Sequence, residues 1–419
     1  MKAVDRLRRL GPYALVALLA ITAAACSSYP NTTFSPHSEF GRDIDALWNR
    51  LLLLGSIVFV LVEGVLLFIV FRYRHRGGDG KPPQTHGNAK LEILWTLIPA
   101  VILVFIAIPT VRTIFKTQAA APAGSLEVEV IGHQWWWEFR YPEHGIVTAN
   151  ELYLPTGRTV NFTLHSADVI HSFWAPQLGG KRDVITNRTN HLWYTPDSSM
   201  QAAVWNGFCA EFCGTSHANM RFRVFTVNPE QFASWVAWQK TPAAFGAVAS
   251  APQPAAGAPG AVASSTPQMM TEAAAVTTGA GYVFPREKIP EWAVPHTPPP
   301  SGLKFTAGLT GNAHRGQQVF TSSACIGCHS IAGNPAALGV VGPNLTHVGS
   351  RSTIAAGRYP NVAAYLALWI KNARVMKPGV TMPTLGANEY DPILKTTVTT
   401  GGLTDQQIAD IVAYLTALK

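Results

Sequence analysis

The stretch CAEFCGTSHANM, from Cys209 to Met220, indicates the chemistry and the domain type of this chain. It offers two thiols, an imidazole and a thioether at Cys209, Cys213, His217 and Met220. Soft sulfur and imidazole ligands favour copper over magnesium or calcium. One loop rarely completes such a site, and His171 in ADVIHSFWAP is the best candidate for a second imidazole. Two bridging thiolates, two imidazoles, a thioether and a backbone carbonyl would hold two copper ions that share one electron.

Two other interpretations of this stretch stay open on the residues alone. Cys209 and Cys213 could form a disulfide in an oxidising compartment, or a Cys–Cys–His set could bind zinc. Either interpretation accounts for two or three of the residues. Neither accounts for Met220 or for the membrane segments upstream.

A second motif, CIGCH from Cys325 to His329, is the attachment signature of a c-type haem. Cys325 and Cys328 would form thioethers to the haem vinyl groups, and His329 is placed to bind the iron. The sixth ligand is expected to be a methionine, because thioether ligation raises the reduction potential. Met376 and Met382 both lie at a plausible distance downstream.

Two long apolar runs predict a membrane hairpin. Leu51 to Phe71, interrupted only by Glu63, and Ile93 to Val111 are each long enough to cross a bilayer core of about 30 Å as a helix. The segment 72–90 between them is strongly basic, which places it in the cytoplasm and the chain after the second run outside. Because an ionisable group within a span is costly, we expect Glu63 to face a neighbouring subunit.

The first 25 residues have the pattern of a lipoprotein-type signal peptide. A basic start is followed by an apolar run from Tyr13 to Ile21 and by small residues directly before Cys26. Cys26 would become the lipidated first residue. The alternative is an uncleaved anchor or an ordinary signal peptide with an incidental cysteine.

The rest of the chain divides by composition. Residues 26–120 hold the N-terminal segment and the hairpin. Residues 121–240 contain short runs of β-branched and aromatic residues, which predict an antiparallel sandwich or barrel. Residues 241–304 are rich in Ala, Pro, Gly and Ser and predict a flexible linker. Residues 305–419 predict helices around the haem motif, with a last helix from Thr404 to Leu418.

Charge suggests that the two outer domains attract each other, and it gives no support for nucleic-acid binding. The formal net charge is +8, but no basic stripe is interleaved with aromatics in a recognisable module. Residues 305–419 hold eight Lys and Arg against four acids, whereas residues 122–240 hold eight against ten. We therefore expect the linker to let the haem domain reach the copper domain without being fixed to it, and the charges to favour weak docking there.

Residues 40–240 resemble subunit II of cytochrome c oxidase. The resemblance rests on the ligand stretch, the preceding GHQWWWEF and the two-helix hairpin. The resemblance implies a cupredoxin-like Greek-key barrel that holds the binuclear copper centre CuA. It assigns the copper ligands to the side chains of His171, Cys209, Cys213, His217 and Met220 and to the main-chain oxygen of Glu211.

The same resemblance implies roles for three further groups. The carboxylate of Glu211 would lie near a magnesium site shared with the catalytic subunit. Trp135 would be the tryptophan through which a cytochrome c delivers electrons, in a Trp-Trp-Trp where the family usually has Trp-Tyr-Trp. Glu92 would stand at the cytoplasmic mouth of a proton path into subunit I. The alternative for Glu92 is a solvated carboxylate at a helix start, where the helix dipole favours it.

The C-terminal segment resembles the all-α class I cytochromes c, which carry one covalent haem. The resemblance rests on Gly316, Phe320, the GPNL at 342–345 and Tyr414. The context KPGVTMP resembles the loop that ends in Met-Pro in that family. It favours Met382 as the sixth ligand and leaves Met376 to pack.

The expected function is the entrance of electrons into a bacterial respiratory haem-copper oxidase. The spans contain no histidine, so reduction of dioxygen must occur in a partner. The resemblance implies that this partner is subunit I, which also pumps protons, and that subunit III accompanies it. Cytochrome c or quinol–cytochrome c reductase would donate electrons, and the fused haem would pass them to the copper near Trp135. The chain would be a two-pass inner-membrane protein with both outer domains in the periplasm.

Two other functions are compatible with parts of this pattern. The chain could be a membrane-tethered CuA and haem c carrier for a nitrous oxide or nitric oxide reductase. It could also be a binding-only relative of the kind found in quinol oxidases, but those lack the copper ligands that this chain has.

Overall fold

The computed structural model describes residues 13, 16–21, 31–74, 86–243 and 281–419. Cys26 and most of the predicted signal peptide lie outside the described residues. The chain forms two compact units. The first holds residues up to 122 with the short segments 176–180 and 192–195, and the second holds the remainder.

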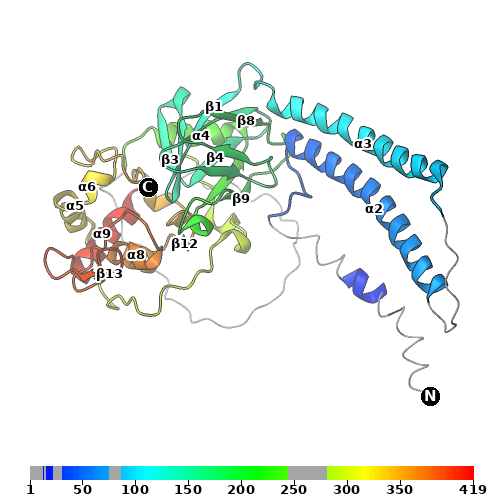
Figure 1. The fold of residues 1–419 in the computed structure, drawn as a ribbon. Coiled ribbons are helices and arrows are strands. Elements are labelled where there is room, and N and C mark those ends of the chain that lie inside the picture. The colour runs from blue at the N-terminus through cyan, green and yellow to red at the C-terminus, as the bar shows by residue number, and fades with distance from the viewer. Residues whose placement is uncertain (1–12, 14–15, 22–30, 75–85, 244–280) are drawn as a thin grey trace. The chain divides into compact units, whose positions relative to one another are not determined.

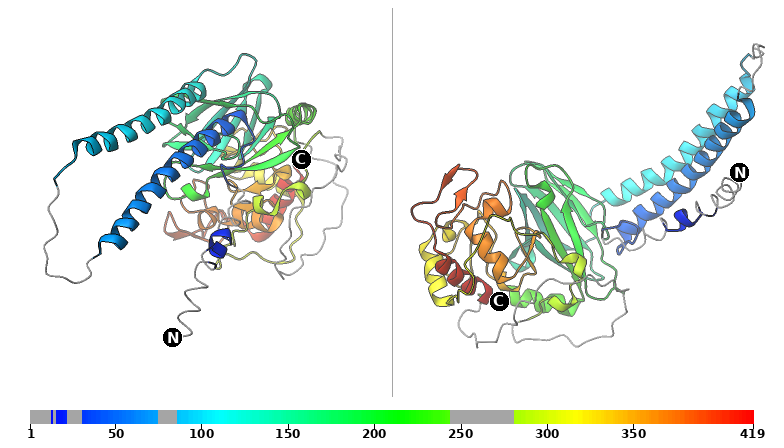
Figure 2. Two further views of the ribbon diagram at one scale, coloured as in Figure 1. Left: turned by 90° about the vertical axis from the view of Figure 1, so that its right-hand side faces the viewer. Right: turned by 90° about the horizontal axis from the view of Figure 1, so that it is seen from below.

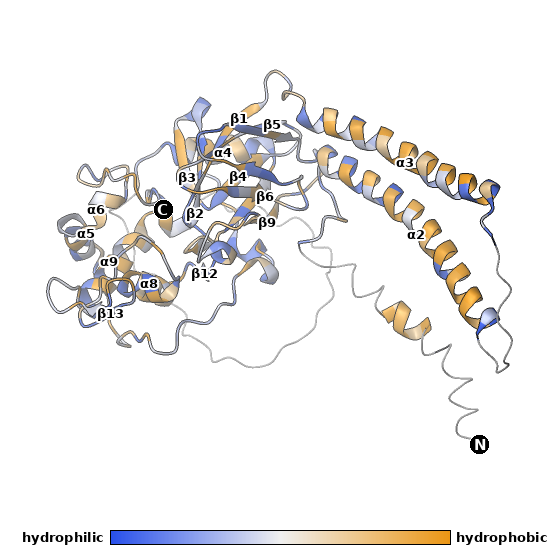
Figure 3. Ribbon diagram, in the orientation of Figure 1, coloured by the Kyte–Doolittle hydropathy of each residue, from blue (hydrophilic) through white to orange (hydrophobic). Residues whose placement is uncertain are grey.

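Two long helices, α2 (Glu39–Tyr73) and α3 (Ala89–Gln118), form a hairpin in the first unit (Figures 1 and 2). The side chain of Ser38 caps α2 and that of Asn88 caps α3, each by accepting backbone N–H groups of the first turn. Apolar residues predominate along both helices (Figure 3), and the most apolar stretch of each is not buried within the structure. Both helices are long and apolar enough to cross a membrane, as the sequence predicts.

Ten strands build the β domain, which we define as the strands β1 to β10 and the helix α4 that follows them. The strands are β1 (Leu126–His133), β2 (Trp136–Tyr141), β3 (Ile146–Ala149), β4 (Glu151–Pro155), β5 (Val160–Ser166), β6 (His171–Trp174), β7 (Arg182–Val184), β8 (Asn190–Tyr194), β9 (Ala203–Cys209) and β10 (Arg221–Val227), and the helix is α4 (Pro229–Gln239). They form two five-stranded sheets, in the orders β3-β2-β1-β5-β8 and β4-β10-β9-β6-β7. The cupredoxin-like architecture is confirmed.

Most neighbouring strands pair antiparallel, as expected, but two pairs are parallel. β1 pairs with β5 in parallel, and β10 pairs with β4 in parallel. Parallel neighbours need a crossover connection, so these strands are not consecutive in the chain. Short turn-separated runs predict the strands themselves, but they carry no information about such crossovers.

An aromatic core fills the space between the sheets. Trp137, Phe139, Phe162, Phe173 and Phe222 are fully buried. Phe173 stacks on Phe222 with ring centroids 4.8 Å apart, and Trp137 meets Phe222 edge to face at 5.6 Å. Burial of one such side chain contributes roughly 1.5–3 kcal/mol to stability. The core therefore forms a rigid support for the strands β6 and β9.

The helical domain, residues 305–419, is built from five α-helices and two short strand pairs. They are α5 (Ala313–Ser322), α6 (Cys325–Cys328), β11 (Thr353–Ile354), β12 (Tyr359–Pro360), α7 (Ala363–Lys371), α8 (Ala373–Met376), β13 (Tyr390–Asp391), β14 (Thr396–Thr397) and α9 (Asp405–Ala417). α5 crosses α9 at Gly316, where an added Cβ would lie 1.9 Å from the Asp410 carbonyl oxygen. Phe320 meets Tyr414 edge to face at 5.7 Å, so three of the residues that carry the cytochrome c resemblance meet at this crossing.

Residues 281–304, which we call the strap, are packed against both domains of the second unit. The Phe284 N–H donates to the Tyr153 hydroxyl at 3.2 Å, and the Phe284 side chain is buried against Phe225. Arg286 donates to the carbonyls of Gly349 and Arg351. The flexible coil expected over 241–304 is therefore wrong for the strap, because a few large apolar side chains anchor it within a Pro-rich stretch. Residues 244–280 lie outside the described residues.

Candidate functional site

The loop between β9 and β10 holds the predicted copper ligands in place. β9 ends at Cys209, and the Cys209 N–H donates to the Met220 carbonyl at 3.1 Å, which closes the loop. β6 lies beside β9 in the sheet, with Phe173 opposite Cys209. His171 at the start of β6 is thereby brought to the loop from 38 residues away in sequence.

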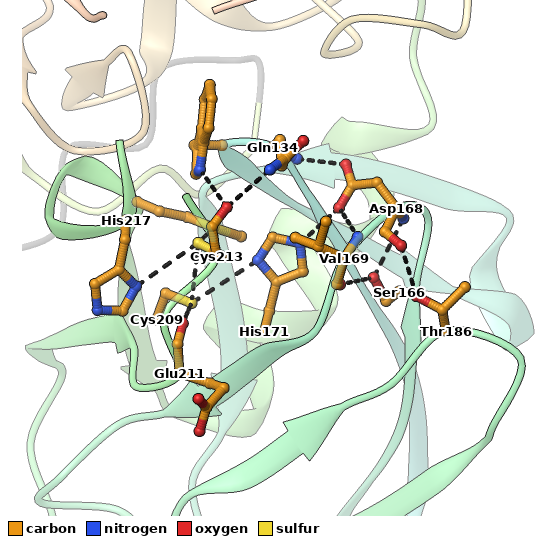
Figure 4. A network of polar contacts seen from close by, with 12 residues as sticks. Gln134, Ser166, Asp168, Val169, His171, Thr186, Cys209, Glu211, Cys213 and His217 are labelled. Atoms are coloured by element: carbon orange, nitrogen blue, oxygen red, sulfur yellow. Dashed lines mark hydrogen bonds and ion pairs between the residues drawn. The ribbon is translucent and has the colours of Figure 1, made fainter. Parts of the chain in front are cut away.

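The donor atoms gather around the two cysteine sulfurs (Figure 4). The two Sγ atoms are 3.7 Å apart. His171 Nδ1 lies 3.8 Å from Cys209 Sγ. His217 Nδ1 and Met220 Sδ lie 3.6 Å and 3.9 Å from Cys213 Sγ. The main-chain carbonyl oxygen of Glu211 is 3.2 Å from Cys209 Sγ. Glu211 itself is exposed. All six predicted donor residues therefore converge.

The disulfide interpretation of Cys209 and Cys213 was wrong. A disulfide requires an S–S separation near 2.05 Å, well below the 3.7 Å found here, and both thiols are free. The zinc interpretation leaves the nearby thioether and carbonyl unexplained, because a structural zinc site is completed by Cys, His or carboxylate groups.

The two neighbouring thiols form a donor pair that suits a soft cation. Their hydrogen bond lowers the pKa of Cys209, while the nearby Cys209 sulfur raises the pKa of Cys213. Cys209 is therefore the more readily ionised of the two thiols. Thiolates are the form of cysteine that binds copper, and a bound cation would favour ionisation of both sulfurs, so the residues fit the binuclear copper group.

Asp168 is a site residue that the sequence analysis missed. Its Oδ1 lies 2.8 Å from His171 Nε2, which turns the other ring nitrogen toward Cys209. Burial lowers the pKa of His171, but the bonds with Asp168 and Cys209 outweigh burial and raise it overall. A carboxylate that orients a metal-ligating imidazole is a common supporting feature of metal sites. The available signal was an aspartate three residues before the histidine, in an otherwise apolar stretch.

Trp135 is linked directly to the ligand loop. Its indole Nε1 donates to the Cys213 carbonyl at 2.9 Å, and the Gln134 side chain donates to the same oxygen at 2.8 Å. The Trp135 side chain is 8% exposed. The six-membered ring of its indole meets the helical domain, because a Cβ added at Gly379 would lie 2.7 Å from that ring.

The CIGCH motif forms a short helix followed by an oriented imidazole. Cys325 and Cys328 bound the short helix α6, and both are free. His329 follows, and its Nδ1 lies 2.8 Å from the Pro343 carbonyl, which fixes Nδ1 as the donor and leaves Nε2 for a metal. Burial lowers the pKa of His329 and so favours the neutral imidazole that binds iron.

The structure separates the two candidate methionines. Met376 in α8 is fully buried and belongs to the hydrophobic core of the helical domain. Met382 lies half-buried in a bend outside that core. Met376 therefore packs, as the sequence predicts, and Met382 is the one that is not committed to packing.

The predicted proton-path residue lies apart from the outer site. Glu92 is in the first turn of α3, where a carboxylate is favourable by the helix dipole, and its side chain is exposed. Glu63 is half-buried within α2. Neither residue forms part of a metal-ligating group among the described residues.

These features define a class of protein. Two membrane-length helices, a cupredoxin-like domain with a sulfur and imidazole donor cluster, and a helical CxxCH domain describe a membrane-anchored copper and haem electron-transfer protein.

Comparison with known proteins identifies the family. "Cytochrome C oxidase subunit II, transmembrane domain" matches residues 33–113, "Cytochrome C oxidase subunit II, periplasmic domain" matches residues 145–227, and "Cytochrome c" matches residues 313–419. Cytochrome c oxidase subunit 2 of Bacillus sp. strain PS3 is 30% identical over 97% of each chain. That of Alkalihalophilus pseudofirmus is 30% identical over 87% of this chain and 84% of its own.

Among solved structures, the periplasmic domain of subunit II of cytochrome oxidase of Bradyrhizobium japonicum is 29% identical to this chain. It covers 29% of this chain and 97% of its own, with a TM-score of 0.27.

The chain belongs to the cytochrome c oxidase subunit II family and carries a C-terminal cytochrome c domain. It is a component of the oxidase, with copper in its periplasmic domain and haem in its cytochrome domain. Membership implies a membrane-anchored protein with subunit I as its partner.

Proposed function

We propose that this chain is the subunit through which electrons enter a haem-copper terminal oxidase. Electrons would come from cytochrome c, including its own fused haem c, and pass by CuA to subunit I, which reduces dioxygen and pumps protons. The observation that supports this most directly is the position of Trp135. It bonds to the backbone of Cys213 on one side and contacts the cytochrome domain on the other.

The ligand assignments are part of this proposal. His171, Cys209, Cys213, His217 and Met220 by side chain, and Glu211 by its main-chain oxygen, would hold the two copper ions. Cys325 and Cys328 would attach one haem covalently, with His329 and Met382 as axial ligands. When bound, both groups supply reversible one-electron chemistry.

The residues of the chain prepare these groups in three ways. The aromatic core fixes the strands that carry His171 and Cys209, so the ligands need little rearrangement. Asp168 orients the His171 ring, and Trp135 and Gln134 hold the loop at the Cys213 carbonyl. The sulfur donors are buried, which excludes water from the site.

Direct contacts between the two domains support the fused haem as the donor. Ser352 of the cytochrome domain donates from its N–H and its hydroxyl to Glu151 Oε1, at 2.7 and 2.5 Å. The Arg221 N–H, at the start of β10, donates to the Ala356 carbonyl at 3.1 Å. The strap adds a buried contact on each side, at Phe284 and at Leu303.

Cutting the chain between residues 243 and 281 should make reduction of copper by the haem depend on protein concentration. A tether supplies an effective concentration of up to about millimolar, which dilution of the separated parts removes. High salt should weaken the reaction further, because the domains differ in net charge. The measurement is stopped-flow absorbance of haem and copper in intact and cut protein over a dilution series, with uncut protein carrying the same inserted protease site as control.

The intact chain should show a copper reduction rate that does not change with dilution. If the severed copper domain were reduced equally fast with no haem domain present, the fused cytochrome would not be the donor.

Glu92 is proposed to admit protons to subunit I from the cytoplasmic side. Glu92→Gln in the assembled oxidase should slow oxygen consumption, roughly several-fold, and leave the arrival of electrons at copper unchanged. Oxygen uptake between pH 6 and 9 and copper reduction in stopped flow measure the two effects separately. Unaltered oxygen uptake across this range would support the solvated-carboxylate alternative.

The remaining expectations follow from the same proposal. The carboxylate of Glu211 would meet a magnesium ion at the interface with subunit I. Subunit III would be a further partner, and cytochrome c or quinol–cytochrome c reductase the external donor. The chain would cross the bacterial inner membrane twice after removal of residues 1–25, with Cys26 lipidated. The domain limits would be 26–120, 121–240, 241–304 and 305–419.

A further inference from the structure

Lys377 is a buried cation at the contact between the cytochrome domain and the copper-binding β domain. Its side chain is 1% exposed, and its Nζ donates to the Trp135 carbonyl at 2.6 Å and to the Ala355 carbonyl at 3.1 Å. In the described part of the chain the hydrogen-bond partners of this ammonium are these two carbonyls, and no carboxylate acts on it. The two accepting carbonyls belong to different domains, with Trp135 on the β domain.

A buried ammonium without a carboxylate is costly, so its partners indicate what it is for. Burial lowers the pKa of Lys377 to about 7, with the neighbouring Arg358 acting in the same direction. The Ala355 carbonyl orients the ammonium from within its own domain. The shorter bond, however, goes to Trp135, and only contact between the domains provides it.

The turn that carries Ala355 supports an interface role. Ala355 and Ala356 have φ angles of 55° and 59°, which are uncommon for residues other than glycine. This backbone aims the Ala355 carbonyl at Lys377 and the Ala356 carbonyl at the Arg221 N–H. A backbone conformation of this kind is unfavourable and persists only where surrounding contacts hold it.

The residues after Lys377 fit the same surface. The Ser216 hydroxyl donates to the Pro378 carbonyl at 2.6 Å. Gly379 has a φ of +85°, and a Cβ there would lie 2.7 Å from the Trp135 ring. The segment Lys377–Gly379 therefore lies against Trp135, three residues before Met382.

We propose that Lys377 is the positioning residue that holds the cytochrome domain in register on Trp135. It does so by satisfying the Trp135 carbonyl, which the contact would otherwise bury without a donor. The expected consequence, faster electron transfer from haem to copper, rests on the proposed function. The docking of the two domains can be measured independently of it.

The test uses the full chain loaded with copper and haem and compares Lys377→Met with the wild type. The Arg221 amide reports docking, because it lies in the β domain and donates to Ala356 of the cytochrome domain. Its hydrogen-exchange protection should fall about tenfold in Lys377→Met, because one charged hydrogen bond is lost and a carbonyl is left unpaired. Lys395→Met, which removes an exposed cation from the same domain, should leave this protection unchanged.

Two further readouts separate positioning from a general structural role. The haem spectrum and the exchange of amides in α5 and α9 should match the wild type, while the rate of copper reduction by the haem falls. If Lys377→Met lost its haem spectrum, Lys377→Gln would replace it, because a shorter neutral amide does not reach both carbonyls. The deciding variant is the one that keeps its haem spectrum. If the hydrogen-exchange protection of the Arg221 amide is unchanged in that variant, the proposal is overturned.

The two proposals fail in different ways. If the wild type showed no transfer from haem to copper while Lys377→Met still lost Arg221 protection, the proposed donor would be wrong and the positioning role would stand. If transfer were present and Lys377→Met changed neither protection nor rate, the positioning role would be wrong and the donor would stand.

Discussion

Cys209→Ser should abolish the binuclear copper site and leave the haem spectrum as it is. Cys209 Sγ lies within 3.8 Å of Cys213 Sγ, His171 Nδ1 and the Glu211 carbonyl oxygen, so it is at the centre of the donor cluster. A hydroxyl is a hard donor that does not ionise near neutral pH, and the one remaining thiolate would not suffice to hold two copper ions. Copper per haem should fall from about two to well below one, as expected for loss of a bridging ligand.

Elemental analysis of copper against haem c, together with the visible spectrum, measures this effect. Thr215→Ala is the matched control, because Thr215 is an exposed residue of the same loop outside the donor cluster. A Cys209→Ser protein that still held two coppers per haem with an unchanged spectrum would refute the ligand assignment.

Met382→Ala and Met376→Ala should change different properties of the cytochrome domain. Met382→Ala should lower the haem potential and leave a five-coordinate or water-bound iron, because the thioether ligand is lost. Met376 is fully buried in the core, so Met376→Ala should lower the free energy of unfolding by about 2–5 kcal/mol. Its effect on the haem potential should be small.

Redox titration and the visible spectrum measure the first effect, and denaturant unfolding of the cytochrome domain in the full chain measures the second. Each variant is the control for the other. If Met376→Ala changed the axial ligation while Met382→Ala left it intact, the ligand would be Met376, and the alignment with class I cytochromes c would be wrong in this loop.

Local patterns determined the types of structure and the donor atoms. The two spans follow from long apolar runs. An apolar helix of that length matches the thickness of the bilayer core, where lipid surrounds its side chains. The strands β1, β5, β9 and β10 follow from runs of β-branched and aromatic residues. Five of the six copper donors lie within twelve residues, and the haem motif within five, so their chemistry needs no tertiary information.

His171 is an intermediate case between local and tertiary information. Its type and its place after a strand made it the best candidate, but only the pairing of β6 with β9 brings it to Cys209. Asp168 was missed, because an aspartate near a histidine in sequence becomes informative only when the ring orientation is known. The parallel pairing of β1 with β5 was missed for a similar reason, since a run of strand residues does not specify its neighbours.

Only the tertiary structure decided how the two outer domains meet. Lys377 and Trp135 are 242 residues apart, and Ser352 and Glu151 are 201 apart. Composition predicted a flexible linker up to residue 304, whereas Phe284 and Leu303 anchor the strap in two different cores. A sequence pattern reports which surfaces a segment can bury along its own length. It does not report which distant backbone carbonyl a buried lysine will reach, because that depends on the position of every element between them.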